Sequence, residues 1–251
     1  MPPAARRRTT RTRDTHWTEA QADGHTATMS ASSTSHAAQL VLRHFRWIGG
    51  HADVWAVFRD AQALRALVVG LAEPVREEGI TAVCGIESRG FLLGAAVAVE
   101  LGVGFVPVRK GIGMLPGDKA FGQTTADYRG LRHTLRLQRE MIGAGDRVLL
   151  VDDWLETGAQ AATVRDIVEQ CGATWAGCSV LVDQLTDERR EAIGPVHAVL
   201  KAAELPADPL AVSAPAPLRE LPAAPSPAGG PADGSSDAQP AEPVPASVPG
   251  S

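Results

Sequence analysis

Residues Val148–Gln160 read VLLVDDWLETGAQ, and this stretch decides the fold class. Four apolar residues, typical of a strand buried on both faces, run into two adjacent carboxylates, Asp152 and Asp153. A turn of small residues, Thr157-Gly158-Ala159, follows, and the chain then takes up a helical pattern. A strand that passes through a turn into a helix is the unit of a parallel α/β sheet. In such sheets ligands bind at the carboxyl ends of the strands.

The same alternation of strand and helix extends on both sides of that stretch. Apolar residues recur at helical spacing in three segments that end at or beside a glycine, so we expect helices over residues 60–79, 90–102 and 160–173, the first capped by Asp60. Short apolar runs predict strands over residues 80–86, 103–110, 146–153 and 175–185, and a fifth near Val196. The sequence therefore predicts an α/β domain with a Rossmann-like parallel sheet and helices on both faces.

The two ends of the chain differ in composition from its middle. Residues 1–36 are rich in Ser, Thr and Arg without an apolar period, and residues 205–251 hold 12 of the 18 prolines. Ordering a residue costs about 1–2 kcal/mol of backbone entropy, and neither end has the apolar surface to offset that. We therefore expect disordered extensions at 1–36 and 205–251 around one domain at 37–204, with Met29 as an alternative start.

Net charge and cysteine content indicate which partners and which cellular compartment to expect. The net charge of −5 gives no basic surface for nucleic acid, and no apolar run approaches the roughly 20 residues that span a bilayer. We therefore expect neither a nucleic-acid nor a membrane partner. The three cysteines, Cys84, Cys171 and Cys178, are odd in number and lack C-x-x-C spacing, which favours reduced thiols in a cytoplasmic protein. The Arg-rich start leaves a transit peptide open.

Two loops at the expected carboxyl edge carry cations. The loop GIESRGF, Gly85–Phe91, combines glycines that allow close backbone approach with Arg89, which suits binding of phosphate oxygens. It equally suits a plain turn with Ser88 as N-cap and Arg89 in solvent. The loop over residues 109–130 is long and Gly-rich, with Arg109 and Lys110 at its root. Loops of this length are lids or disordered insertions, and both readings stay open.

The third loop is the opening stretch itself. Asp152 and Asp153 are two like charges in sequence, and ribose hydroxyls or a magnesium ion bound to them would give both an opposite partner. The turn Thr157–Gln160 offers N–H groups, a hydroxyl and a helix dipole to a monophosphate. The dipole contributes only about 0.3–1 kcal/mol, so the N–H groups would do most of the binding. The plainer alternative is an exposed Asp-Asp turn that caps a helix.

Four segments in order carry a family resemblance: GIESRGFLLGAAVAVELG, VPVRKGIGMLPG, DYRG and DRVLLVDDWLETGAQ. They resemble the type I phosphoribosyltransferases, and most closely the adenine branch. The resemblance implies that fold with a flexible hood loop, transfer of a phosphoribosyl group from phosphoribosyl pyrophosphate to a purine base, Mg²⁺ on the pyrophosphate near Asp152, and a homodimer.

The resemblance also implies roles for individual residues. It assigns the pyrophosphate to the loop after the first strand, often with a non-proline cis peptide, and to two cations: Glu87, Ser88, Arg89, Gly90, Arg109 and Lys110. Asp152 and Asp153 would hold the ribose, and the 5′-phosphate would bind the turn formed by Thr157, Gly158, Ala159 and Gln160. A hood over residues 109–128 would end in Asp127 and Tyr128, in place of a Glu-Tyr pair. The catalytic residues would be Glu156, Asp153 and Asp127, with Glu156 managing a proton on the base nitrogen.

This chain departs from the family pattern near the base. Gln160 stands where the signature has a hydroxyl residue, Glu156 where adenine enzymes have a small one, and Trp154 changes the mouth of the crevice. Spacing places the adenine-contacting segment on residues 48–55, which lack its usual motif. Two alternatives therefore stay open: an enzyme for another base, and a non-catalytic sensor of phosphoribosyl pyrophosphate. The net acidity counts against the sensor.

Overall fold

The computed structural model describes residues 34–111, 114–125 and 132–209. The described residues all belong to one compact unit, which lies within residues 1–212. The predicted extensions at 1–36 and 205–251 therefore lie largely outside the described residues. Residues 34–44 are helical. None of the described helices is long and apolar enough to cross a membrane.

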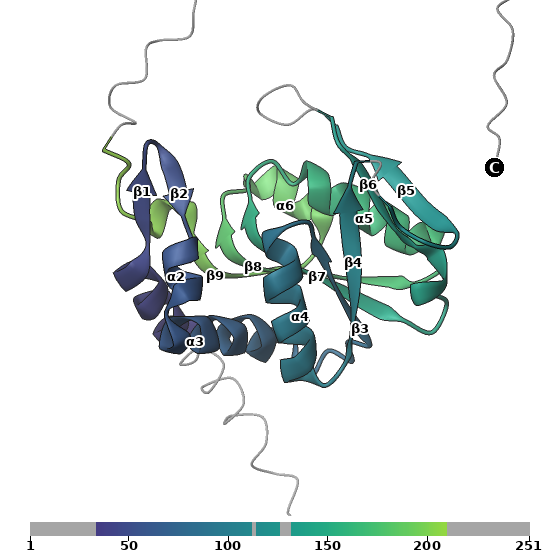
Figure 1. Cartoon of the computed structure of the whole chain (residues 1–251), viewed down its shortest axis with the longest axis horizontal. Coiled ribbons are helices and arrows are strands. Elements are labelled where there is room, and N and C mark those ends of the chain that lie inside the picture. The colour runs from purple at the N-terminus through teal and green to yellow at the C-terminus, as the bar shows by residue number, and fades with distance from the viewer. Residues whose placement is uncertain (1–33, 112–113, 126–131, 210–251) are drawn as a thin grey trace, which may run out of the picture. The chain divides into compact units, whose positions relative to one another are not determined.

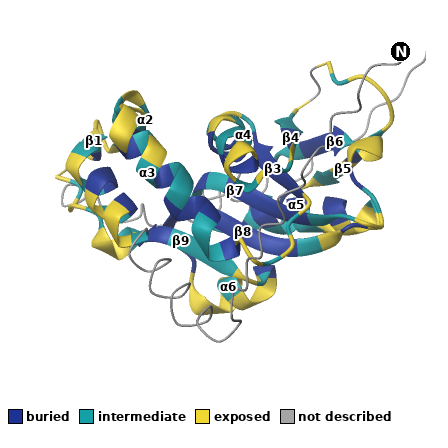
Figure 2. Ribbon diagram, turned by 90° about the horizontal axis from the view of Figure 1, so that it is seen from below, coloured by how far each residue is buried: buried dark blue, intermediate teal, exposed yellow. Residues whose placement is uncertain are grey.

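A seven-stranded sheet in the order β5-β6-β4-β3-β7-β8-β9 forms the centre of the fold (Figure 1). Its five parallel strands are β4 (Gly104–Lys110), β3 (Ala82–Ile86), β7 (Arg147–Leu155), β8 (Thr174–Asp183) and β9 (Val196–Lys201). Every residue of β3 is buried, and Figure 2 shows the central strands of the sheet mostly in the dark blue of buried residues. The prediction of a parallel α/β sheet is confirmed for these strands.

The other two strands correct the expectation of a structureless loop. β5 (Lys119–Gln123) pairs antiparallel with β6 (Thr134–Gln138), and β6 pairs antiparallel with β4, so part of the long segment after β4 extends the sheet. Leu135 and Leu137 are fully buried. Burial of these apolar side chains against α5 (Ala159–Gln170) gives the segment the surface it needs to order. Asp127 and Tyr128 lie outside the described residues.

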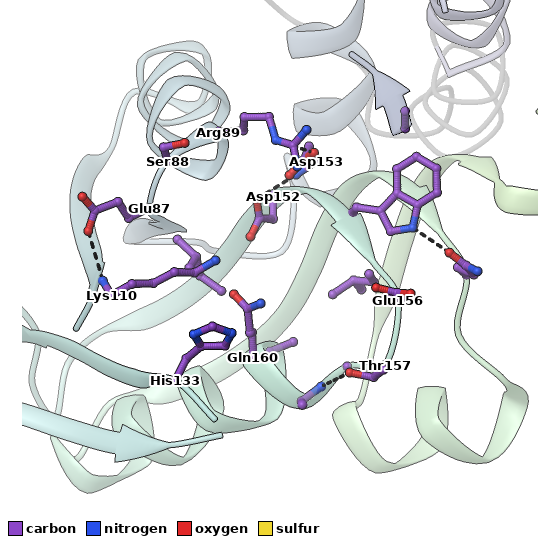
Figure 3. A pocket seen from close by; sticks show the side chains of 18 of the residues that line it. Glu87, Ser88, Arg89, Lys110, His133, Asp152, Asp153, Glu156, Thr157 and Gln160 are labelled. Atoms are coloured by element: carbon purple, nitrogen blue, oxygen red, sulfur yellow. Dashed lines mark hydrogen bonds and ion pairs between the residues drawn. The ribbon is translucent and has the colours of Figure 1, made fainter. Parts of the chain in front are cut away.

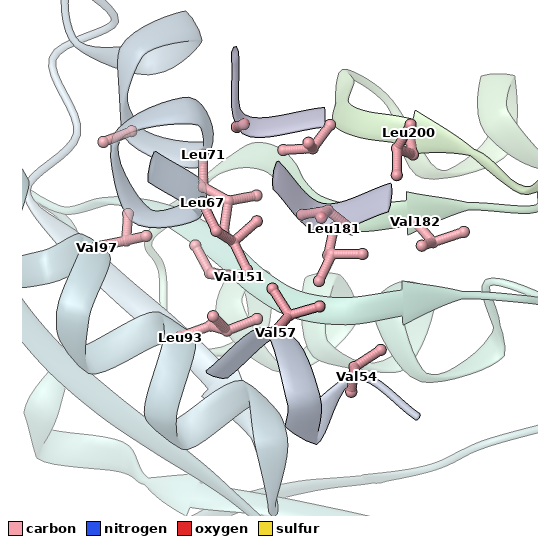
Figure 4. Close-up of a cluster of buried hydrophobic side chains, with 14 of the residues drawn as sticks. Val54, Val57, Leu67, Leu71, Leu93, Val97, Val151, Leu181, Val182 and Leu200 are labelled. Carbon is pink, nitrogen blue, oxygen red and sulfur yellow. The ribbon is translucent and has the colours of Figure 1, made fainter. Parts of the chain in front are cut away.

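Helices cover both faces of the sheet. On one face α3 (Ala61–Ala72) and α4 (Arg89–Leu101) contribute Leu67, Leu71, Leu93 and Val97 to a cluster that includes Leu149 and Val151 of β7 (Figure 4). On the other face α5 contributes Val164 and Ile167 to a cluster with Val148 and Leu150. Neighbouring residues of β7 therefore face opposite helices, as the alternation of side chains along a strand requires.

The predicted N-cap of α3 is confirmed, but the predicted end of the helix is wrong. The carboxylate of Asp60 accepts hydrogen bonds from the N–H groups of Gln62 and Ala63. The helix stops at Ala72 rather than running to Gly79, and a 3₁₀ turn, η2 (Glu73–Val75), follows. Pro74 explains the difference, because proline lacks the N–H that a continuing helix would donate and its ring crowds the carbonyl four residues earlier.

A hairpin that the sequence reasoning did not predict precedes α2 (Trp55–Arg59). Strands β1 (Arg46–Ile48) and β2 (His51–Asp53) pair antiparallel around Gly49 and Gly50, whose φ angles are 58° and 75°. Two positive φ angles in a two-residue turn are the signature of a tight hairpin, and a Gly-Gly pair between short strands is its sequence signal. The indole N–H of Trp47 donates to the carbonyl of Pro206 at 2.8 Å, which ties the hairpin to the segment after β9.

Candidate active site

A cleft of about 690 Å³ lies at the carboxyl ends of β3 and β7. Residues Asp152–Ala161 line it continuously, from the tip of β7 through the turn into the first residues of α5. Glu87–Arg89 and Lys110 line it from the neighbouring parallel strands (Figure 3). The sheet thus brings together three chain segments that are far apart in sequence, at the edge where the strand pattern predicts a ligand crevice.

The loop after β3 does not follow the plain-turn alternative. The Glu87–Ser88 peptide bond is cis. Ser88 occupies the N-cap position of α4, but its side chain makes no capping hydrogen bond. Arg89 is not directed only to solvent, because its Nε lies 2.9 Å from Oδ2 of Asp153. The loop after β3 and the tip of β7 are therefore held together by an ion pair.

Glu87 connects the loop after β3 to the end of β4. Its carboxylate accepts hydrogen bonds from the backbone N–H of Lys110 at 3.1 Å and from Arg109 Nε at 3.1 Å (Figure 3 marks the Lys110 bond). The bond from the Lys110 backbone and then the Arg109 guanidinium hold the pKa of Glu87 below its usual value. Arg109, predicted as a substrate ligand, is not among the described residues that line the cleft, because Glu87 and the carbonyl of Met114 bind its guanidinium. Lys110 does line the cleft.

Asp152 and Asp153 are neighbours in β7, so their side chains start on opposite faces of the sheet. Both residues nevertheless line the cleft. Asp153 is only 6% exposed. Its contact with Arg89 lacks hydrogen-bond geometry, and within the described part of the chain its Oδ2 accepts no hydrogen bond. A buried carboxylate oxygen in this state suits a ligand hydroxyl. The alternative of an exposed Asp-Asp turn is therefore wrong.

Asp152 is electrostatically strained. Burial, and then the nearby charge of Asp153, raises the pKa of Asp152 well above its usual value. Its Oδ1 accepts a hydrogen bond from the backbone N–H of Asp153 at 2.9 Å. Gly90 accounts for the close approach of α4, since a Cβ there would lie 3.0 Å from the same oxygen. A cation or a hydroxyl donor in the cleft would relieve the repulsion between the two carboxylates.

The turn after β7 is shaped by Gly158, which has a φ of 74° and sits at the N-cap of α5. The hydroxyl of Thr157 accepts a hydrogen bond of 3.3 Å from the N–H of Ala159. The remaining N–H groups of the first helical turn have no partner within the helix, so they can bind an anion together with the helix dipole. Gln160 projects from the start of α5 towards the middle of the cleft (Figure 3).

Three residues of the cleft wall were not predicted from the sequence: Trp47, His133 and Gln184. Three others, Gly50, His51 and Ala52, were expected near the base only because of their spacing from the following helix. These three hairpin residues fall within residues 48–55, which were expected to contact the base. The ring centroids of Trp47 and Trp154 are 6.4 Å apart at 65°. Gln184 follows β8, and its side chain accepts a hydrogen bond from the indole of Trp154. The Gly-Gly turn was the one local signal for the hairpin.

Comparison with known proteins agrees with this geometry. The family model described as the phosphoribosyl transferase domain matches residues 55–201, more than half of the chain. The chain belongs to the phosphoribosyltransferase family. Among curated phosphoribosyltransferases, the adenine phosphoribosyltransferase of Methylococcus capsulatus is 41% identical over 141 residues, which cover 56% of this chain and 81% of the relative. That of a Nocardioides species is 42% identical over 148 residues, covering 57% and 78%.

Solved phosphoribosyltransferase structures share the fold. The adenine phosphoribosyltransferase of Rhodothermus marinus superposes with a TM-score of 0.60 at 35% identity, covering 66% of this chain and 98% of that one. The Saccharomyces cerevisiae enzyme, solved with adenine and an imino-altritol bisphosphate, gives 0.58 at 31% identity, covering 66% and 99%. The prediction of a type I phosphoribosyltransferase fold is confirmed.

Proposed function

We propose that this phosphoribosyltransferase moves the phosphoribosyl group of phosphoribosyl pyrophosphate to adenine, giving the nucleotide and pyrophosphate in purine salvage. The observation that carries the proposal is the placement of the Asp152–Asp153 pair directly before the Gly158 turn, in one cleft. A sugar phosphate carries hydroxyls at one end and an anion at the other, and this arrangement offers a partner to each. The relatives at about 40% identity bear the name of the adenine enzyme.

In this proposal the sugar phosphate is bound from both ends. Asp152 and Asp153 accept hydrogen bonds from the ribose 2′- and 3′-hydroxyls, and the buried Oδ2 of Asp153, which pairs with Arg89 but accepts no hydrogen bond within the described residues, supports that role. The N–H groups at the start of α5 bind the 5′-phosphate, with the side chains of Thr157 and Gln160 beside them. Fixing both ends holds the anomeric carbon in place for displacement.

The leaving pyrophosphate would bind at the opposite end of the cleft. Ser88, Arg89 and Lys110 line that end, Gly90 allows the backbone to approach, and Glu87 with Arg109 holds the two loops together. Mg²⁺ would arrive on the substrate, bound to the pyrophosphate, as the resemblance to the type I phosphoribosyltransferases implies. That fits an ion that keeps waters and uses one or two carboxylates plus phosphate oxygens, and Asp152, which lines the cleft, would be one such carboxylate. The ion would supply charge neutralisation to the leaving group.

Proton and charge management would fall to carboxylates. The developing positive charge on the sugar is stabilised by the negative charge of Asp153. Glu156 lines the cleft two residues before Gly158 and would accept the proton that the base nitrogen loses. Asp127 and Tyr128 keep their proposed place in the hood, outside the described residues.

We also propose a cytoplasmic homodimer. All three cysteines are free thiols, two of them buried, which suits a reducing compartment. Leu92 and Val99 lie seven residues apart on α4 and are 54% and 82% exposed, which supports an apolar contact with a second copy. Light scattering of the purified protein measures the mass and tests the dimer.

The test of function is a panel assay. The purified chain receives phosphoribosyl pyrophosphate, Mg²⁺ and one base at a time: adenine, hypoxanthine, guanine, xanthine or uracil. Release of pyrophosphate with adenine in clear excess over the others is the expected result. Preference for another base would favour the second candidate, an enzyme for that base, for which Glu156 and Trp154 at the cleft are the specific observations. Binding of phosphoribosyl pyrophosphate without release for any base would favour a sensor.

A further inference from the structure

Part of the cleft wall is formed by an indole and an amide side chain. Trp154 lies on β7 directly after Asp153, and Gln184 lies directly after β8. Both line the cleft. The indole Nε1 of Trp154 donates a hydrogen bond of 2.8 Å to Oε1 of Gln184. The two residues are 30 positions apart in the chain, so the contact is a product of the tertiary fold.

That bond decides which end of the Gln184 amide faces a ligand. An indole N–H can only donate, so its partner must be the amide oxygen and not the amide nitrogen. A donor-only partner therefore removes the usual uncertainty between the two ends of a glutamine side chain. With its oxygen bound to Trp154, the NH2 group is the part of the Gln184 side chain left to serve a ligand, and Gln184 is one of the residues that line the cleft.

The backbone around Gln184 is held firmly. Its own N–H donates to the carbonyl of Leu155 at 2.8 Å, which ties it to the tip of β7. Asp183, with a fully buried side chain, accepts from the N–H of Leu185 at 2.8 Å and pairs with Lys201 at 2.8 Å. Arg190 also pairs with Asp183. A donor on such a fixed segment loses little freedom when it binds a ligand.

We propose that Gln184 is a specificity-determining residue that donates a hydrogen bond to a ring nitrogen of the purine, and that Trp154 fixes the direction of that donor. The proposal rests on the function proposed above. Adenine carries ring acceptors at N1, N3 and N7 and one exocyclic donor, its 6-amino group. A fixed NH2 group meets a ring nitrogen favourably and an amino group unfavourably.

The test combines a change in the protein with a change in the substrate. Values of kcat/KM are measured for adenine and for its 1-deaza, 3-deaza and 7-deaza analogues with wild type and Gln184→Leu, at saturating phosphoribosyl pyrophosphate and Mg²⁺. The loss of one hydrogen bond to the base should lower kcat/KM about fivefold. We expect one analogue to show that penalty in wild type and none in Gln184→Leu. Intrinsic differences in analogue reactivity cancel in the comparison.

Further variants separate recognition from structure. Gln184→Glu keeps an oxygen for Trp154 but has no donor, so it should lose adenine activity like Gln184→Leu while KM for phosphoribosyl pyrophosphate stays unchanged. Gln170→Leu is the matched control, because Gln170 is exposed at the end of α5 and is not among the described residues of the cleft wall. Trp154→Phe keeps an aromatic ring but removes the anchor, and should reduce the analogue discrimination.

Three results would overturn the inference, and they differ. If all three deaza analogues carry the same penalty in wild type and Gln184→Leu, Gln184 does not read a ring nitrogen, while wild-type turnover of adenine still upholds the proposed function. If wild type releases pyrophosphate with none of the bases, the proposed function fails and this inference fails with it. If KM for adenine and KM for phosphoribosyl pyrophosphate rise equally in Gln184→Leu and the melting temperature falls, Gln184 has a structural role only. That result would also overturn the inference.

Discussion

Replacement of Gly158 by alanine tests whether the turn after β7 has the shape that only glycine provides. Gly158 has a φ of 74°, where a residue with a side chain is strained by about 1–2 kcal/mol. An added Cβ would overlap Cδ1 of Ile193 and would lie 3.2 Å from Cδ2 of Leu185. Ile193 is 3% exposed, so it cannot move into solvent, and relief of the overlap should cost about 1–3 kcal/mol.

Gly158→Ala should therefore lower the stability by about 2–5 kcal/mol, which is about 5–15 °C in melting temperature for a domain of this size. Gly172→Ala is the matched control. Gly172 has a similar φ of 81°, but an added Cβ meets only the backbone nitrogen of Ala144 at 3.9 Å, so it isolates the backbone strain. We expect Gly172→Ala to lose only the stability that corresponds to the backbone strain, about 1–2 kcal/mol.

The functional readout follows from the position of Gly158 at the start of α5. Displacement of the turn moves the N–H groups that would bind the 5′-phosphate, so KM for phosphoribosyl pyrophosphate should rise about tenfold, corresponding to about 1.4 kcal/mol. KM for the base should change little, and Gly172→Ala should leave both unchanged. Thermal unfolding and a pyrophosphate-release assay provide the two measurements. Equal melting temperatures for the two variants, or an unaltered KM for phosphoribosyl pyrophosphate in Gly158→Ala, would refute the reasoning.

Three further predictions concern the carboxylates and the C-terminal segment. Because burial and Asp153 raise the pKa of Asp152, the folded protein binds a proton that the unfolded chain has released, so stability should fall as pH rises from about 4 towards the raised pKa. Asp152→Asn should remove that fall, melting no lower than wild type at pH 7, while losing activity; a wild-type pH profile in the variant would contradict this. Asp153→Asn should cut turnover and weaken sugar binding, and should destabilise by only about 1 kcal/mol, since its partner Arg89 is 36% exposed; unchanged kinetics would show that the acid pair does not bind substrate. Deletion of residues 210–251 should leave melting temperature and activity nearly intact, because Trp47 is bound by Pro206, upstream of the cut; a large loss in either would show that the deleted segment stabilises the domain.

Local patterns were sufficient for most elements. The apolar run of β3, the helical period of α4 and the acid pair before a glycine turn each depend on residues adjacent in sequence, and the structure has all three. The errors also have local causes. Helix α3 ends early at a proline, and the segment after β4 was read as loop because its short strands β5 and β6 become stable only when they pair and pack on α5.

The sequence by itself determined the order of the central strands and helices, the edge of the sheet at which the cleft lies and the residues of the turn after β7, because periodicity and turn residues act over a few neighbouring positions. The tertiary structure alone decided how the side chains pair: Glu87 takes Arg109 out of the cleft, Arg89 meets Asp153, and Trp154 orients Gln184. These contacts join residues 22, 64 and 30 positions apart. Such pairs depend on which strands lie side by side, and strand order is fixed by packing of the whole sheet rather than by any short segment.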